Sequence, residues 1–299
     1  SEIPQNKRRE TLLKNKDKAL LSRKLVTLKE DVPVEDDPSS FIIKEVKKDN
    51  LYNFLREMEF NRLLSQAISF YGEDNISDSS LNIKQTKASK IDTKLYKSIL
   101  NEKDLEKLID ILNTKPFISI DTETSSLNPL EAELIGISFS YAPNEAYYIP
   151  LGHKNIKSLN KELVLKKIKP LLEDPSIKKV GQNIKYDFII LTNNGIEINP
   201  VEDTMLLSYV LDAGNNRHNM DILSELHLGH KTISYKDVVG TGKKQLNFSD
   251  VNLEEATKYA AEDADVTLRL YNLLLERVNN EKLKKIYEVF EKPMVKLLS

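Results

Sequence analysis

A strand that ends in acidic residues, Phe117-Ile118-Ser119-Ile120-Asp121-Thr122-Glu123-Thr124, decides the fold class of this sequence. Its apolar start predicts a short buried strand over 117–121. Because side chains alternate along a strand, Asp121 and Glu123 lie on the same side of it. Two carboxylates after a buried strand stand at the sheet edge where open α/β folds bind ligands. An Asp-x-Glu pair is common, so it indicates a metal site only together with other residues.

The segments that follow this strand predict a mixed α/β sheet. Apolar runs over 134–140 and 145–150 come after short connections, which is typical of an antiparallel meander. Further periodic segments predict helices over 101–113, 162–172, 183–193, 203–211, 220–228 and 253–278, a strand over 177–180, and a last helix from 282. The expected fold is a mixed sheet flanked by helices, preceded by a small helical segment.

The first 70 residues differ from this α/β part. Residues 1–24 are basic and carry helix-spaced leucines, which indicate either a solvated helix pair or a surface that faces phosphates. Another helical pattern runs from about 50 to 70. The polar segment 71–90 has no period and is expected to be a linker. The α/β domain is then expected over 91–295.

Composition excludes several classes of protein. The chain of 299 residues has no cysteine, which excludes disulfides, Cys-zinc sites and thiol nucleophiles. The absence of cysteine is also compatible with a reducing cytosol, and a cytoplasmic protein is expected. No apolar run approaches the roughly 18 residues of a membrane helix, so no membrane partner is expected. The net charge of −2 excludes a generally basic binder of nucleic acid. It is compatible with an enzyme whose local carboxylates gather metal cations.

A second motif lies at the turn from the 177–180 strand into the next helix. Asn183 and Asp187 are four residues apart, so they are expected on one helical face. A structural interpretation is equally simple. Asn183 would cap the helix, and Asp187 would favour its positive N-terminal end.

A third motif lies on the long helix near the C-terminus. Tyr259 and Asp263 are again four residues apart, with alanines beside them that allow close approach. The alternative is a surface helix whose tyrosine packs on the core. We expect the neighbouring Glu262 and Asp265 to be solvated acids.

Together the motifs supply four carboxylates from three elements: Asp121, Glu123, Asp187 and Asp263. Mg²⁺ prefers carboxylate oxygens and retained waters, and two such ions about 4 Å apart promote in-line displacement at a phosphodiester. Tyr259 is placed to hold the attacking water. The sequence therefore predicts two divalent metal ions, Mg²⁺ first and Mn²⁺ or Zn²⁺ as alternatives.

The order of the motifs resembles a known family. Asp121-x-Glu123, Asn183-x-x-x-Asp187 and Tyr259-x-x-x-Asp263 resemble the three motifs of the DEDD 3′–5′ exonucleases, tyrosine subtype. Over roughly residues 85–295, the strings 121–127, 180–187, 203–205, 230–233 and 259–268 are similar to the proofreading domain of bacterial family A DNA polymerases. Residues 22–32 resemble the C-terminal end of their 5′-nuclease region.

This resemblance implies a ribonuclease H-like fold and a piece of a longer chain. Residues 1–70 would end the 5′-nuclease region, and residues 296–299 would begin the connection to a polymerase domain. The implied protein is a monomer that binds a single-stranded or frayed 3′ end of DNA. It releases nucleoside monophosphates during proofreading.

The resemblance also implies a role for each matching residue. Asp121, Glu123 and Asp263 would hold one ion, and Asp121 with Asp187 would hold the second. Tyr259 and Glu123 would orient the water. Leu127 and Tyr235 would stack on the terminal bases, and the terminal nucleotide would be lined by Thr124, Gln182, Asn183, Tyr186 and Met205. Two alternatives stay open: an RNA-trimming exonuclease, and an inactive domain that binds single strands or acts as a spacer.

Overall fold

A computed structural model describes residues 3–31, 33, 46–58, 60–72, 90–242 and 245–299 of the chain. The chain divides into two units, Ser1–Leu81 and Asn82–Ser299. Most of the linker predicted over 71–90 lies outside the described residues. Among the helices of the described residues, none is both long enough and apolar enough to cross a membrane.

The described part of the first unit is helical, as predicted. It contains α1 (Asn6–Lys14), α2 (Lys16–Val26), α3 (Lys48–Glu57) and α4 (Asn61–Tyr71). Helices α1 and α2 form the predicted helix pair and bury no side chain. The single pattern over 50–70 is in fact two helices, because Tyr52 and Leu55 of α3 can bury themselves only by packing on Leu64 of α4. The Tyr52 hydroxyl closes this hairpin by donating to the Gly72 carbonyl at 2.9 Å.

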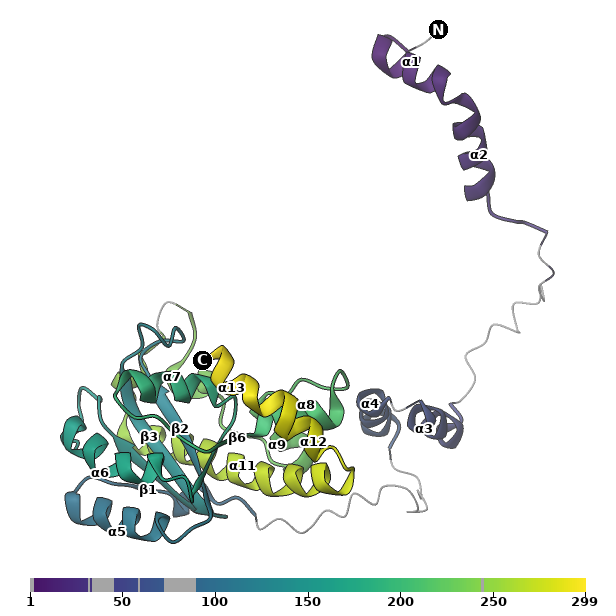
Figure 1. The fold of residues 1–299 in the computed structure, drawn as a ribbon. Helices are drawn as coiled ribbons and strands as arrows, with labels where there is room; N and C mark the ends of the chain where they lie inside the picture. Colours follow the sequence, from purple (N-terminus) through teal and green to yellow (C-terminus); the bar gives the residue numbers. More distant parts are fainter. Residues whose placement is uncertain (1–2, 32, 34–45, 59, 73–89, 243–244) are drawn as a thin grey trace. The chain divides into compact units, whose positions relative to one another are not determined.

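Within the described residues, the second unit is built on one six-stranded mixed sheet in the order β1-β4-β3-β2-β5-β6 (Figure 1). The strands are β1 (Lys97–Ser98), β2 (Phe117–Thr124), β3 (Leu134–Ala142), β4 (Glu145–Pro150), β5 (Lys178–Gly181) and β6 (Val201–Asp203). The β2–β3 and β3–β4 pairs are antiparallel, which confirms the predicted meander. Strands β1, β5 and β6 add parallel pairs. Strands β1 and β6 were not predicted, since two or three residues are too few to show alternation.

Helices cover both faces of the sheet (Figure 1). On one face α5 (Glu102–Leu112), α6 (Lys161–Glu173) and α7 (Lys185–Asn193) share a core with Ile118 and Ile120 of β2. The other main helices are α8 (Thr204–Asp212), α9 (Met220–Leu228) and α11 (Leu253–Asn280), which share a second core with Val180 of β5. The shorter elements are η2 (Thr93–Leu95), α10 (Tyr235–Val239), η4 (Phe248–Asp250), α12 (Lys284–Ile286), η5 (Tyr287–Glu291) and α13 (Lys292–Leu298).

Helix α11 packs directly across β2, β3 and β4. The approach is close because the facing residues are small: Ala260, Ala261 and Ala264 are fully buried. The Ser119 hydroxyl of β2 donates to the Ala264 carbonyl at 2.6 Å. This contact brings the acidic residues of α11 and β2 to the same side of the sheet.

Candidate metal centre

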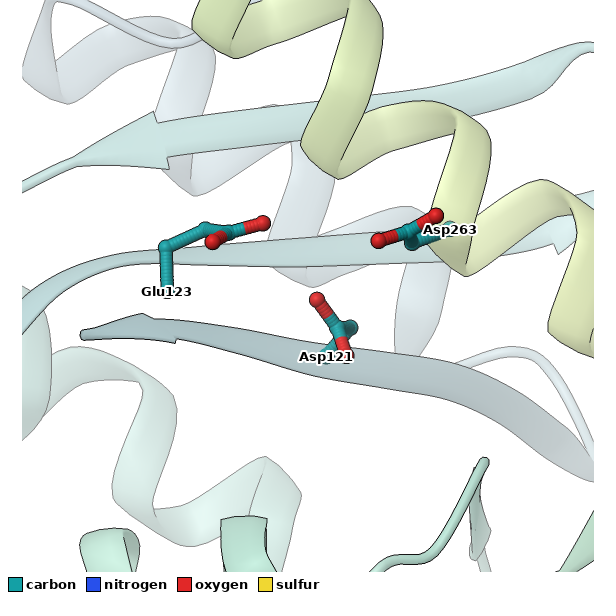
Figure 2. Close-up of side chains that lie close together, drawn as sticks. All are labelled: Asp121, Glu123 and Asp263. Atoms are coloured by element: carbon teal, nitrogen blue, oxygen red, sulfur yellow. The ribbon is translucent and has the colours of Figure 1, made fainter. Parts of the chain in front are cut away.

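Three carboxylates converge between β2 and α11: those of Asp121, Glu123 and Asp263 (Figure 2). One oxygen from each lies within 4.8 Å of the others. Strand alternation sends Asp121 and Glu123 to the same face as Ser119, which is the face that α11 covers. The side chain of Asp263 projects from α11 into the same space.

Burial and mutual repulsion make this group of acids unfavourable without a cation. Burial raises the pKa of Asp121, and the charges of Asp187, Glu123 and Asp263 raise it further. Burial followed by the charge of Asp263 raises the pKa of Glu123, and burial raises that of Asp263. Within the described residues, no ion pair joins a lysine or arginine to any of these acids.

The donor set fits a hard divalent cation. Oε1 of Glu123 is buried and has no hydrogen-bond partner among the described residues. A buried carboxylate oxygen without a partner is costly, unless a bound cation compensates it. The ligands are all carboxylate oxygens, which Mg²⁺ and Mn²⁺ prefer.

Asp187 lies near this group but does not belong to it. Its Oδ1 accepts hydrogen bonds from the Thr122 backbone N–H at 2.9 Å and from the Thr122 hydroxyl at 2.6 Å. Thr122 faces the α7 side of β2, whereas Asp121 faces the α11 side, so Asp187 approaches from the opposite layer. Burial raises the pKa of Asp187 to about 7. Sequence reasoning missed Thr122, which holds Asp187, since nothing in an Asp-Thr-Glu string marks its middle residue.

Tyr259 lies one turn before Asp263 on α11, as predicted, and its hydroxyl lies beside that carboxylate. Burial raises the pKa of Tyr259, and the charges of Asp263, Glu123 and Asp121 raise it further. The tyrosine therefore stays protonated and keeps a hydrogen that it can donate. Its ring contacts Phe248 at 5.9 Å between centroids, which fixes the position of the hydroxyl.

Asn183 does not lie on the face of α7, so the expectation of a shared helical face with Asp187 is wrong. It precedes the helix with a left-handed φ of 57°. Helix α7 has Ile184 as its N-cap residue and no side-chain cap bond, so Asn183 does not cap it either. The reason is the tight turn after β5. A Cβ on Gly181 would lie 2.8 Å from the Ile184 side chain. The turn is this tight only because residue 181 is a glycine.

Two other residues expected at the terminal nucleotide lie on this turn and on α8. The Gln182 amide donates to the His218 carbonyl at 2.7 Å and accepts from the Thr204 hydroxyl at 2.5 Å. Both ends of this amide therefore have partners within the protein. Met205 is a half-buried residue in the first turn of α8.

Thr124 and Tyr186 hold the loop that presents Leu127. The Tyr186 hydroxyl donates to the Ser126 carbonyl at 2.5 Å and also hydrogen-bonds the Thr124 hydroxyl. The Thr124 hydroxyl also lies 3.1 Å from the same carbonyl. Leu127, the next residue, is 93% exposed and free to contact a ligand.

Tyr235 belongs to an aromatic cluster beside the acids. Its ring stacks on Phe248 with 6.3 Å between centroids and 10° between planes, and it contacts the Tyr259 ring at 6.0 Å. The Tyr235 side chain is 40% exposed. One face of the ring is thus held by the protein, while part of it stays accessible.

Glu262 and Asp265 are not solvated acids, so that expectation is wrong: both are fully buried. Glu262 hydrogen-bonds His230 Nε2 at 2.8 Å and the Ile233 backbone N–H at 2.6 Å. Asp265 pairs with Arg269 at 2.9 Å and accepts from the Tyr96 hydroxyl at 2.8 Å. The partners of these acids, Arg269 excepted, are distant in sequence, so helical periodicity gave no signal for them.

The described fold is similar to the folds of two solved proteins. The Pol1 polymerase of M. smegmatis, solved with DNA primer-template and dNTP, has a TM-score of 0.53 at 16% identity, covering 67% of this chain and 30% of that one. The catalytic core of RRP6 from Trypanosoma brucei has a TM-score of 0.50 at 17% identity, and the match covers 62% of this chain and 47% of that one. At these identities the likeness shows the fold, and the predicted ribonuclease H-like mixed sheet is confirmed.

Curated relatives match the whole chain. DNA polymerase I of Rhizobium leguminosarum is 34% identical over 100% of this chain and 37% of its own length. DNA polymerase I of Pseudomonas aeruginosa is 35% identical over 96% of this chain and 32% of its own length. DNA polymerase I of Borreliella burgdorferi is 36% identical over 99% of this chain and 33% of its own length. The chain spans about a third of the length of these relatives.

A family comparison covers the part of the chain that carries the acids. The model described as "3'-5' exonuclease" matches residues 96–279, which include every residue of the candidate centre. Divalent metal ions are implied for this family, and the acidic group of Asp121, Glu123 and Asp263 fits them. The predicted class of enzyme, a nuclease, is thus confirmed, and the chain belongs to the 3′–5′ exonuclease family.

Proposed function

We propose that this domain is a proofreading 3′–5′ exodeoxyribonuclease that hydrolyses the 3′-terminal phosphodiester of DNA and releases nucleoside monophosphates. The main support is the group of Asp121, Glu123 and Asp263, of which Glu123 and Asp263 are buried, without a basic partner among the described residues. Such a group binds cations at neutral pH, because cations offset both its burial and its repulsion. The relatives named DNA polymerase I support DNA as the substrate.

The proposed centre holds two divalent ions, with Mg²⁺ as the expected metal. Asp121, Glu123 and Asp263 hold the first ion, and Asp121 with Asp187 holds the second. The ions supply an activated water and stabilise the oxygens of the in-line displacement.

The protein orients the water through two side chains. Tyr259 stays protonated, so its hydroxyl donates a hydrogen bond toward the space next to Asp263. The unpartnered Oε1 of Glu123 accepts a hydrogen bond from the attacking water. Their fixed positions favour one direction of attack.

The proposed substrate site lies around the carboxylates. Leu127 and Tyr235 stack on the last bases, which is a mode of binding that tolerates any base. The terminal nucleotide is lined by Thr124, Gln182, Asn183, Tyr186 and Met205. Because the Gln182 amide already has two partners, it contributes by holding the turn rather than by reading a base.

The wider organisation is proposed from the resemblance of residues 22–32 to the end of a 5′-nuclease region and from the greater length of the relatives. Residues 1–70 end a 5′-nuclease region, 71–90 form a linker, 91–295 form the exonuclease domain, and 296–299 lead toward a polymerase domain. The protein acts as a monomer in the bacterial cytoplasm, where its DNA substrate is found.

The test is digestion of 5′-labelled single-stranded DNA and RNA of the same sequence, with Mg²⁺ or with EDTA. We expect stepwise shortening of the DNA from its 3′ end, with nucleoside monophosphates as products, and no reaction in EDTA. Asp263→Asn should abolish the reaction. Glu254→Gln, an exposed acid on the same helix, should leave it unchanged. Preference for RNA would support the RNA-trimming alternative, and binding without cleavage by the wild type would support the inactive one.

A further inference from the structure

Asp203 accepts four backbone hydrogen bonds from two separate segments. Its Oδ1 accepts from Met205 at 2.9 Å and from Leu206 at 3.4 Å, which caps helix α8. The same oxygen accepts from the Asn183 N–H at 3.0 Å, and Oδ2 accepts from the Ile184 N–H at 3.1 Å. The side chain is 1% exposed, so water does not replace these bonds. An N-cap residue needs only the bonds to its own helix.

The additional bonds hold the turn that leads into α7. Asn183 has a left-handed φ of 57°, and Ile184 is the N-cap residue of the helix. Asp187 lies in the first turn of that helix, and its carboxylate is anchored to Thr122 at the other end. A shift of the turn would therefore tilt the first turn of α7 and move Asp187 relative to Asp121.

Asp203 is itself held by the C-terminal helical segment. The Tyr287 hydroxyl accepts a hydrogen bond from the Asp203 backbone N–H at 3.0 Å and donates one to Glu202 at 2.8 Å. Glu202 is buried and pairs with Lys292 at 2.9 Å. A connected set of contacts thus runs from η5 through β6 to the turn before α7.

We propose that Asp203 is a positioning residue for the second metal ion: it sets the place of Asp187, and Tyr287 sets the place of Asp203. This proposal rests on the two-ion site proposed above. The bonds to Asn183 and Ile184 carry this role, whereas the bonds to Met205 and Leu206 serve only the stability of α8.

Two substitutions separate the two roles. Asp203→Ser keeps an oxygen that caps α8 but is too short to reach the turn. Asp203→Asn keeps Oδ1 and its three bonds, and turns an NH₂ group toward the Ile184 N–H. The matched control is Asn160→Ala, which removes the cap of α6 through Leu163 and touches neither the turn nor Asp187. Tyr287→Phe removes only the hydroxyl.

The measurement is a Mn²⁺ titration followed by electron paramagnetic resonance, with deoxythymidine monophosphate present to supply phosphate oxygens. We expect two ions on the wild type. Loss of a residue that orients a metal ligand typically weakens the metal by about 10–100-fold. Asp203→Ser should weaken the second ion by that factor and leave the first unchanged. Asp203→Asn and Tyr287→Phe should have smaller effects in the same direction, and Asn160→Ala should bind both ions like the wild type despite a lower melting temperature.

The outcomes distinguish this proposal from the one on which it rests. Wild-type binding of both ions by Asp203→Ser would overturn the positioning role and leave the two-ion site in place. Equal weakening by Asn160→Ala would also overturn it, since general destabilisation would then explain the loss. Binding of fewer than two ions by the wild type would overturn the two-ion site, and the positioning role with it.

Discussion

The Ser119 hydroxyl donates to the Ala264 carbonyl at 2.6 Å, and this bond joins β2 to α11 next to the metal centre. Ser119 lies two residues before Asp121 on the strand, and Ala264 directly follows Asp263 on the helix. The separation of these two carboxylates therefore depends on a small side chain and on a buried alanine, neither of which is acidic.

Enlarging Ser119 should disturb the centre. Ser119→Val adds bulk at this contact, which typically costs about 1–3 kcal/mol in a packed core and should push α11 away from β2. We expect weaker Mn²⁺ binding by calorimetry. Ser119→Ala is the control, because it removes the hydrogen bond without adding bulk. Loss of the bond should lower the free energy of unfolding by about 1 kcal/mol. Unchanged Mn²⁺ affinity in Ser119→Val would show that the contact does not set the geometry of the centre.

Asp187→Ala should reduce exonuclease activity more than Tyr259→Phe. The first change removes a carboxylate of the second ion, and loss of such electrostatic stabilisation typically costs about 10²–10³ in rate or more. The second change removes only a hydroxyl that orients water, so we expect on the order of 10-fold. Single-turnover digestion of single-stranded DNA measures both rates.

Binding of single-stranded DNA should persist in both of these variants, because Leu127 and Tyr235 are unchanged. Circular dichroism provides the control for folding. If Asp187→Ala kept near-full activity with Mg²⁺, or Tyr259→Phe were the slower of two folded variants, the two-metal assignment would be wrong.

The stability of the metal-free protein should fall as pH rises from about 4 through 7. Burial raises the pKa of Asp187 to about 7 and also raises the pKa of Asp121 and Asp263, whereas the unfolded value is about 3.9. The folded state then binds more protons than the unfolded state between these values, so deprotonation favours unfolding. Melting temperatures in EDTA should decrease from pH 5 to pH 8.

Divalent ions should reverse this effect. Mg²⁺ should raise the melting temperature strongly at pH 8 and little at pH 5, because protonated carboxyl groups do not bind it. Asp263→Asn should stabilise the metal-free protein at pH 8 and flatten the decrease, since it removes one repelling charge. A melting temperature in EDTA that rises from pH 5 to pH 8 would contradict the raised pKa values of Asp121, Asp187 and Asp263.

Tyr235→Ala should weaken binding of single-stranded DNA, whereas Tyr235→Phe should not. Stacking of a base on an aromatic ring is worth about 1–3 kcal/mol, and phenylalanine keeps the ring that packs on Phe248. Fluorescence anisotropy with a labelled oligonucleotide, in EDTA to prevent cleavage, measures the affinity. Comparable weakening by both variants would assign the effect to the hydroxyl instead.

Mismatched 3′ ends should be digested faster than matched ends. The proposed site takes an unpaired terminus, and freeing a paired nucleotide costs a few kcal/mol. Parallel digestion of two duplexes that differ only in the last base pair measures the ratio, with the single strand as reference. Added salt should slow all three reactions, since contacts to the DNA backbone are electrostatic. Equal rates on the two duplexes would contradict the proofreading assignment.

The sequence alone determined which acids could meet. Strand alternation places Asp121 and Glu123 on one side of β2, and helical periodicity places Tyr259 one turn from Asp263. Both relations follow from backbone geometry within a few residues, so they hold wherever the elements pack. The antiparallel meander was predictable for the same reason, because its connections are short.

Only the tertiary structure decided what surrounds each residue. Glu262 and Asp265 looked like solvated acids, yet they are buried because His230, Ile233 and Tyr96 satisfy them from distant positions. Asn183 lies in the turn before α7 rather than on the helix. Asp203, on another strand, holds that turn through the backbone N–H of Asn183. Hydrogen-bond partners far apart in sequence leave no periodic signal, and whether an acid is buried depends on those partners rather than on its neighbours in the chain.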